Sequence, residues 1–289
     1  MTGLICCTLK CNMACQYCYE GNGRNLCAPN LAEINQKFED AIPLFIDLID
    51  QLYAHNQNTT TKVIWHGGEP MLIRPQLMEQ VMLDQLQKGH DIRWEMQSNG
   101  TLVTDEHIRV FQKYKVSVGV SIDGLKKHHD KYRIFKNGNP TYDVIMKNTQ
   151  RLRNSGISCG TLLTITDENV NDLPEIYQEL CKKNLNFSFN ALFPSKADDD
   201  VTLNDNNYAR KICELFDTWI QDEKNGIGIH PSVTHRPGVQ PLGDLLLDAV
   251  ERSAADEENI SCIHGCKRNH GIFTGCADRY FYIASFKKF

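Results

Sequence analysis

The sequence predicts an α/β fold: a partial (β/α)6 barrel of the TIM type, followed by a short C-terminal extension that contains cysteines. Two observations predict this architecture. Short apolar segments alternate with amphipathic helical segments about six times over residues 1–225, a pattern typical of parallel strands joined by right-handed crossovers. The distinctive short motifs follow the strand segments, and in such barrels the chemistry gathers at the carboxyl ends of the strands.

The first two strand–helix pairs occupy residues 3–89. The apolar run at residues 3–9 predicts a strand, and residues 31–56 carry apolar side chains at helical spacing. Residues 61–66 predict a second strand that runs into a Gly-Gly turn. A helix is expected over residues 74–89, because a proline stands near its start and a glycine at its end.

The later pairs repeat the same order. Residues 91–98 predict a strand, and residues 104–114 predict a helix with Thr104 as its N-cap. The remaining strands are expected over residues 116–122, 157–166 and 186–194, and the remaining helices over residues 141–156, 171–184 and 207–223.

The chain is expected to contain two parts. A Gly/Pro-rich stretch follows the last predicted helix, and we place the boundary there. Residues 1–225 form the barrel and residues 226–289 form the extension. No separate module is expected before the first strand, so a peptide substrate would be recognised at the barrel mouth or by another protein.

The composition argues against two classes of function. The net charge is -5 and no basic tract is present, which argues against a nucleic-acid-binding protein. No segment approaches the roughly eighteen apolar residues of a membrane-spanning helix, and the N-terminal residues lack the apolar core of a signal peptide. We therefore expect a cytoplasmic protein with neither nucleic acid nor membrane as a partner.

The twelve cysteines are unevenly distributed. Most stand near the two ends of the chain, at Cys6, Cys7, Cys11, Cys15, Cys18, Cys27, Cys262, Cys266 and Cys276. Without a signal peptide, clustered cysteines favour metal or iron–sulfur ligation over a disulfide framework. The scattered residues Cys159, Cys181 and Cys213 are instead expected to be small buried apolar side chains.

Three of these cysteines, Cys11, Cys15 and Cys18, stand within eight residues and form a motif after the first strand. A structural zinc ion prefers four protein ligands, and Cys27 is the nearest candidate for a fourth. A four-iron cluster held by three cysteines leaves one iron free to bind a substrate or cofactor. The spacing therefore favours the iron–sulfur interpretation and leaves zinc as the alternative.

Further motifs follow the later strands: Gly67–Pro70 after the second, Gln97–Asn99 after the third, and Ser121 with Asp123 after the fourth, with Arg133 beyond them. In this order and spacing the motifs together resemble the signature of the radical S-adenosylmethionine (SAM) enzymes. The resemblance implies that Cys11, Cys15 and Cys18 hold a [4Fe-4S] cluster and that the ring of Tyr17 packs against the adenine of SAM. The other positions that it implies for SAM binding or for the lining of its cavity are Gly67, Gly68, Glu69, Pro70, Gln97, Ser98, Asn99, Ser121, Asp123 and Arg133.

Charge and polarity suit the roles that the resemblance implies. Glu69 would face the amino group of SAM, and Arg133 would pair with its carboxylate. Ser121 and Asp123 would contact the ribose. No residue is assigned as a catalytic base, and the nearby histidines are expected to be hydrogen-bonded or solvated: His66, His128 and His129.

The resemblance further implies an activity. Reductive cleavage of SAM would release a 5′-deoxyadenosyl radical that abstracts hydrogen from the substrate, with a flavodoxin or ferredoxin as electron donor. The motifs most resemble the branch that contains anaerobic sulfatase maturases and peptide-modifying enzymes. The expected substrate is therefore a peptide or protein residue, which would be oxidised or crosslinked. The alternatives are a small-molecule substrate, a shortened inactive relative, and a non-enzymatic iron–sulfur protein.

The tail resembles the start of a SPASM or twitch extension, whose cysteines hold auxiliary clusters. The family places a hairpin at a segment that corresponds to ADRYFYIAS, but Arg279 stands where glycine is expected and Ala284 where cysteine is expected. The sequence ends at Phe289, before further cysteines of that pattern. Two auxiliary clusters are therefore not expected.

Three interpretations of the tail cysteines remain open. Cys262, Cys266 and Cys276 could hold one auxiliary cluster, or could bind zinc together with His264 or His270. They could also be plain thiols.

Overall fold

A computed structural model describes the chain except for residues 1, 19–25, 57–59, 193–204, 225–279 and 284–289. The described residues fall into two compact units. Unit 1 lies within residues 1–121, 130–159 and 270–289, and unit 2 lies within residues 122–129 and 160–269.

The strands of unit 1 form a parallel sheet. Their bounds are β1 (Thr2–Thr8), β2 (Thr61–Gly67), β3 (Ile92–Ser98), β4 (Ser117–Ser121) and β7 (Tyr280–Ile283). Within this unit the strand order is β4-β3-β2-β1-β7, and each of the four pairings is parallel.

The hydrophobic core of unit 1 lies against one face of this sheet. The rings of Trp65 in β2 and Trp94 in β3 stack with their centroids 5.6 Å apart, and Phe38 approaches Trp65 at 6.1 Å. Because side chains alternate along a strand, the intervening residues face the opposite side, where they are half-buried. The sheet therefore has one closed face and one more open face that carries polar groups.

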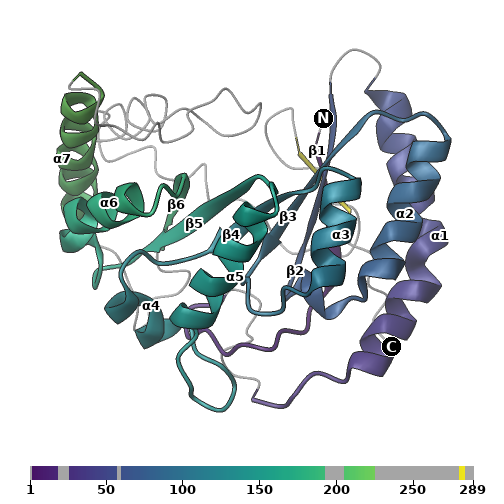
Figure 1. Ribbon diagram of the computed structural model, residues 1–289, viewed down its shortest axis with the longest axis horizontal. Coiled ribbons are helices and arrows are strands. Elements are labelled where there is room, and N and C mark those ends of the chain that lie inside the picture. The colour runs from purple at the N-terminus through teal and green to yellow at the C-terminus, as the bar shows by residue number, and fades with distance from the viewer. Residues whose placement is uncertain (1, 19–25, 57–59, 193–204, 225–279, 284–289) are drawn as a thin grey trace, which may run out of the picture. The chain divides into compact units, whose positions relative to one another are not determined.

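Helices of unit 1 cover the closed face. Their bounds are α1 (Leu31–His55), α2 (Pro75–Gln87), α3 (Asp105–Lys113) and α5 (Tyr142–Asn154). Helix α1 packs against α2, which packs against α3, and Figure 1 shows the three side by side. The predicted cap of α3 is confirmed, because the Thr104 side chain accepts from the His107 N–H in a capping box.

Unit 2 contains a second parallel pair of strands. Strand β5 (Cys159–Ile165) pairs with β6 (Phe187–Ala191). The 3-10 turn η3 (Val170–Asp172) leads into α6 (Leu173–Lys182), which packs against α7 (Asp205–Lys224). Burial of Ile176 and Tyr177 in α6 supplies part of the core of this unit.

The alternating strands and helices confirm the predicted α/β fold class. The short helix α4 (Lys126–Tyr132) was not expected from the sequence. The described part of the predicted tail hairpin is β7, which runs parallel to β1. The rest of that segment lies outside the described residues, so the hairpin stays a prediction. The predicted boundary near residue 226 lies outside the described residues.

The exposure of the three scattered cysteines differs from the prediction. Cys213 is exposed and Cys159 and Cys181 are only half-buried, so the prediction that all three are buried was wrong. Among the helices that the structure describes, none is both long enough and apolar enough to cross a membrane.

Candidate active site

The three cysteines of the motif lie together in the loop after β1. Cys11 and Cys15 are buried around Met13, and Cys18 packs against the same small cluster. The Cys18 N–H donates to the Cys15 carbonyl at 3.2 Å, which turns the chain between the last two cysteines. The structure therefore brings the three predicted ligands together in one largely buried loop.

A segment far away in the sequence holds this loop in place. Met13 and Phe135 form an antiparallel bridge, and the Ala14 N–H donates to the Ile134 carbonyl at 2.9 Å. The Gln16 N–H donates to the Tyr132 carbonyl at 3.1 Å. Sequence analysis missed this partner segment, because an isolated bridge leaves no periodic pattern in either stretch.

The same pairing brings Arg133 to Tyr17. The guanidinium carbon of Arg133 lies 5.2 Å from the centroid of the Tyr17 ring, and the ring of Tyr132 lies 5.7 Å from that of Tyr17. Arg133 is buried, so its charge is placed in a low-dielectric setting beside an aromatic face. Two predicted SAM-binding residues are thus neighbours next to the cysteine loop.

Gly67 and Gly68, at the end of β2, allow close backbone contact with that loop. The Gly68 N–H donates to the Thr8 carbonyl at 2.6 Å, and the Glu69 N–H donates to the Lys10 carbonyl at 2.9 Å. A Cβ at Gly67 would lie 2.4 Å from the Thr8 oxygen, and one at Gly68 would lie 2.3 Å from the Lys10 oxygen. The glycines are therefore required for the cysteine loop to lie against β2.

The carboxylate of Glu69 connects the ends of β2 and β3. It is fully buried and accepts hydrogen bonds from the Met71 N–H at 2.9 Å, the Ser98 hydroxyl at 2.8 Å and the Asn99 N–H at 2.7 Å. Burial raises the pKa of Glu69 to about 6, although the three hydrogen bonds act in the opposite direction. Pro70 follows it as the first residue of the 3-10 turn η2 (Pro70–Leu72).

These contacts lead to a prediction for Glu69→Ala. The substitution leaves three buried donors without their acceptor, so the free energy of unfolding of the apoprotein should fall by about 3 kcal/mol. Denaturant unfolding measures the loss. Ser98→Ala removes one of the three donors and also the acceptor of the Gly100 N–H, so it should cost about 2 kcal/mol. An unchanged unfolding midpoint in Glu69→Ala would show that the carboxylate does not support the fold. The predicted role of Glu69 at the amino group of SAM stays a prediction.

Gln97 is fixed on the open face of the sheet. Its Nε2 donates to the Ser121 hydroxyl at 3.0 Å, which joins two of the predicted cavity residues. A Cβ at Gly119 would lie 2.4 Å from the Gln97 Oε1, so that glycine provides the space for the amide. Sequence analysis missed Gly119, although its place in the middle of a strand was a signal that another group approaches the backbone closely.

The side chains of Cys6 and His66 also lie on the open face of the sheet. Cys6 in β1 is in register with His66 in β2, which precedes the glycine turn, and both are half-buried. The Gly67 N–H donates to the His66 Nδ1 at 2.7 Å, and burial lowers the pKa of His66. Both effects favour the neutral ring with its proton on Nε2. His66 was expected to be hydrogen-bonded, and this is confirmed.

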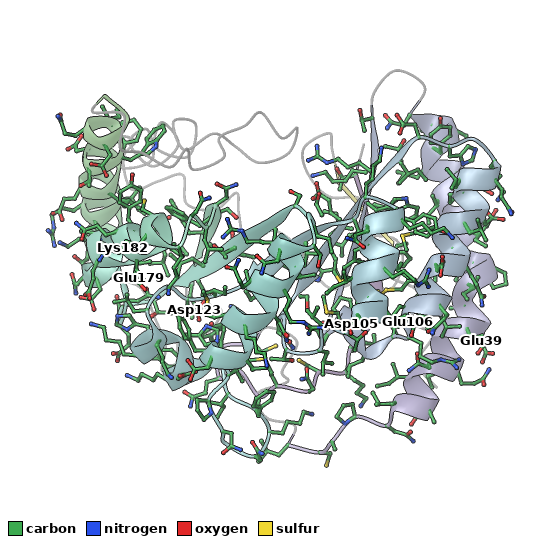
Figure 2. The ribbon with its side chains drawn as sticks, in the orientation of Figure 1. Glu39, Asp105, Glu106, Asp123, Glu179 and Lys182 are labelled. Atoms are coloured by element: carbon green, nitrogen blue, oxygen red, sulfur yellow. The ribbon has the colours of Figure 1, made fainter. Side chains whose placement is uncertain are left out.

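Asp123, which Figure 2 labels, follows β4 in the sequence and belongs to unit 2. It is buried, and its Oδ1 accepts from the Thr164 N–H at 3.0 Å, while its own N–H donates to the His129 Nδ1 at 3.3 Å. His128 pairs with Asp172 at 2.8 Å. The two histidines therefore have hydrogen-bond partners, as expected, and the remaining predicted SAM-binding residues all lie in unit 1.

In the described part of the chain, no group of three or more His, Cys, Asp or Glu side chains converges on the position of a single metal ion. The tail cysteines with their two possible histidine partners lie outside the described residues.

Comparison with known proteins supports the interpretation of the motifs. The model of the Radical SAM superfamily matches residues 5–180. The chain is 29% identical over 238 residues to the serine-type anaerobic sulfatase-maturating enzyme of Bacteroides thetaiotaomicron, covering 74% of this chain and 55% of that protein. It is 27% identical over 301 residues to the uncharacterized protein MJ0907 of Methanocaldococcus jannaschii, covering 97% of this chain and 96% of that protein.

The fold is shared with a solved structure. Native anSMEcpe with bound AdoMet and the Cp18Cys peptide matches with a TM-score of 0.65 at 20% identity, over 78% of this chain and 61% of that one. This match supports the predicted partial barrel of the TIM type. The chain spans only 55% and 59% of the length of the first two sulfatase-maturating relatives. Because the family model covers more than half of the sequence, the chain belongs to the radical SAM superfamily.

Proposed function

We propose that this protein is a radical SAM enzyme that holds a [4Fe-4S] cluster through Cys11, Cys15 and Cys18 and modifies a residue in a peptide or protein. One observation carries the proposal: the three motif cysteines share one largely buried loop that is hydrogen-bonded to the end of β2, beside the residues predicted to bind SAM. Three cysteines suffice to hold a four-iron cluster and leave one iron for SAM.

The loop suits such a cluster chemically. The sulfur of Cys11 accepts hydrogen bonds from the Met13 N–H at 3.4 Å and from the Asn99 amide at 3.6 Å, and N–H donors of this kind stabilise cluster-bound thiolates. Burial, followed by the charge of Glu69, raises the pKa of the Cys11 thiol to about 12. A thiol with that pKa stays protonated at neutral pH unless iron takes the place of its proton.

The surrounding residues suit SAM. When bound, the cluster supplies the electron that cleaves SAM to methionine and a 5′-deoxyadenosyl radical. The buried guanidinium of Arg133 can bind the SAM carboxylate, and the Tyr17 ring beside it offers a face for the adenine. The hydrogen-bonded pair of Gln97 and Ser121 offers polar groups to the cofactor on the open face of the sheet.

A peptide or protein is the substrate class that the comparisons support best. One relative is a sulfatase-maturating enzyme, and the matched solved structure contains a peptide. We propose a flavodoxin or ferredoxin as the electron donor, since each cleavage of SAM consumes one electron.

Anaerobic reconstitution tests the cluster. We expect about four irons per chain and formation of 5′-deoxyadenosine from SAM with a chemical reductant, and neither when Cys11, Cys15 and Cys18 are all changed to alanine. About eight irons falling to about four in that variant would place an auxiliary cluster elsewhere in the chain. Absence of iron from the wild-type protein would contradict the proposed function.

Deuterium transfer tests the substrate class. Synthetic peptides that contain serine or cysteine deuterated at the β carbon should transfer deuterium into 5′-deoxyadenosine if that carbon is attacked. The matched control is the same peptide with alanine at this position. Turnover of SAM without transfer from either labelled peptide would count against the serine and cysteine chemistry of the sulfatase maturases.

A further inference from the structure

The side chain of Asn99 is held in one orientation. Asn99 is buried, and its Oδ1 accepts from the Thr101 N–H at 2.9 Å and from the Thr101 hydroxyl at 2.7 Å. A backbone N–H can only donate, so the carbonyl oxygen of the amide must face Thr101. The NH2 group of Asn99 therefore points the other way.

That NH2 group meets two acceptors in the cysteine loop. Its nitrogen lies 3.0 Å from the Oδ1 of Asn12 and 3.6 Å from the sulfur of Cys11. The Asn12 Nδ2 donates in turn to the Thr101 hydroxyl at 2.8 Å, which closes a ring of side chains. Both protons of the Asn99 amide are thus used, one on oxygen and one on sulfur.

We propose that Asn99 is a positioning residue that donates a hydrogen bond to the first cluster cysteine and thereby raises the reduction potential of the cluster. The inference rests on the proposed function. A reduced cluster carries more negative charge than an oxidised one, and an N–H directed at a ligating sulfur stabilises that extra charge. The backbone N–H of Met13, 3.4 Å from the same sulfur, acts in the same sense.

A second asparagine provides a matched control. Asn148 is as buried as Asn99, and its Nδ2 donates to the carbonyl oxygens of Gly100 at 2.9 Å and Thr101 at 3.1 Å. Asn148 therefore stabilises the same turn by hydrogen bonds to backbone oxygens rather than to a sulfur. Replacing it disturbs the turn and leaves the Asn99 donor in the chain.

The experiment is a redox titration of the reconstituted protein without SAM, followed by electron paramagnetic resonance. Asn99→Leu keeps the approximate size and removes the donor. We expect its reduction equilibrium to shift roughly tenfold toward the oxidised cluster, which is 59 mV for a one-electron couple. Asn99→Asp keeps the shape but places an oxygen near the sulfur, so its shift should be larger. Asn148→Leu should titrate as the wild type does.

The results separate an effect of the Asn99 hydrogen bond from an effect of the turn. Equal potentials for wild type and both Asn99 variants, with iron content maintained, would overturn the inference and leave the proposed function intact. Equal shifts in Asn99→Leu and Asn148→Leu would assign the effect to the turn and would also overturn it. If Asn99→Leu fails to retain iron, the Asn99→Asp titration decides. A wild-type protein without iron would instead refute the proposed function.

Discussion

Replacing Cys15 with alanine is expected to reduce bound iron from about four per chain to near zero and to abolish formation of 5′-deoxyadenosine. Cys15 is buried together with Cys11 and Met13, and Cys18 packs against them, so neither Cys11 nor Cys18 can take the place of the missing thiol without giving up its own. Two thiolates leave half of a four-iron cluster without protein ligands. Iron and sulfide analysis after anaerobic reconstitution measures the effect.

Cys27→Ala is the matched control for that variant. Cys27 is exposed, and its backbone carbonyl accepts from Lys136 at 2.6 Å, a bond that the substitution retains. Iron content and SAM cleavage should stay at the wild-type level. Loss of metal in Cys27→Ala would instead indicate that Cys27 is a fourth ligand. Normal SAM cleavage by Cys15→Ala would contradict the assignment of the cluster ligands.

Gly68→Ala is expected to have the second largest effect, although no catalytic group is changed. The added Cβ would lie 2.3 Å from the carbonyl oxygen of Lys10 and 2.7 Å from its carbon, and neither backbone atom can rotate away. The cysteine loop must then move away from β2, which breaks the 2.6 Å hydrogen bond from Gly68 to Thr8. We expect the free energy of unfolding of the apoprotein to fall by about 3 kcal/mol and reconstituted iron to fall with it.

Gly89→Ala separates this steric effect from the general cost of replacing glycine. Gly89 has a φ of +72°, and a Cβ there meets no atom within 4 Å. The strained backbone should cost about 1 kcal/mol, with full iron content. Equal losses of stability and iron in the two variants would show that close contact at Gly68 is not what holds the cysteine loop.

Much of the fold could be predicted because its signals are local. Thr104 caps α3, and the proline at the start of α2 stands where the sequence predicts, since capping and proline placement depend on a few neighbouring residues. The helix α4 lacked such a signal: its seven residues are almost all polar or charged. The parallel pairing of β7 with β1 also could not be predicted, because the residues of a strand do not indicate which other strand it pairs with.

By itself the sequence determined the family and the spacing of three thiols, because a short loop keeps Cys11, Cys15 and Cys18 close whatever surrounds them. Only the tertiary structure decided which contacts the motif residues make. It turned the Glu69 carboxylate toward the end of β3 and directed the Asn99 amide at a sulfur 88 positions earlier in the chain. Such contacts depend on how strand ends and loops meet in the folded chain, which no local pattern of residues encodes.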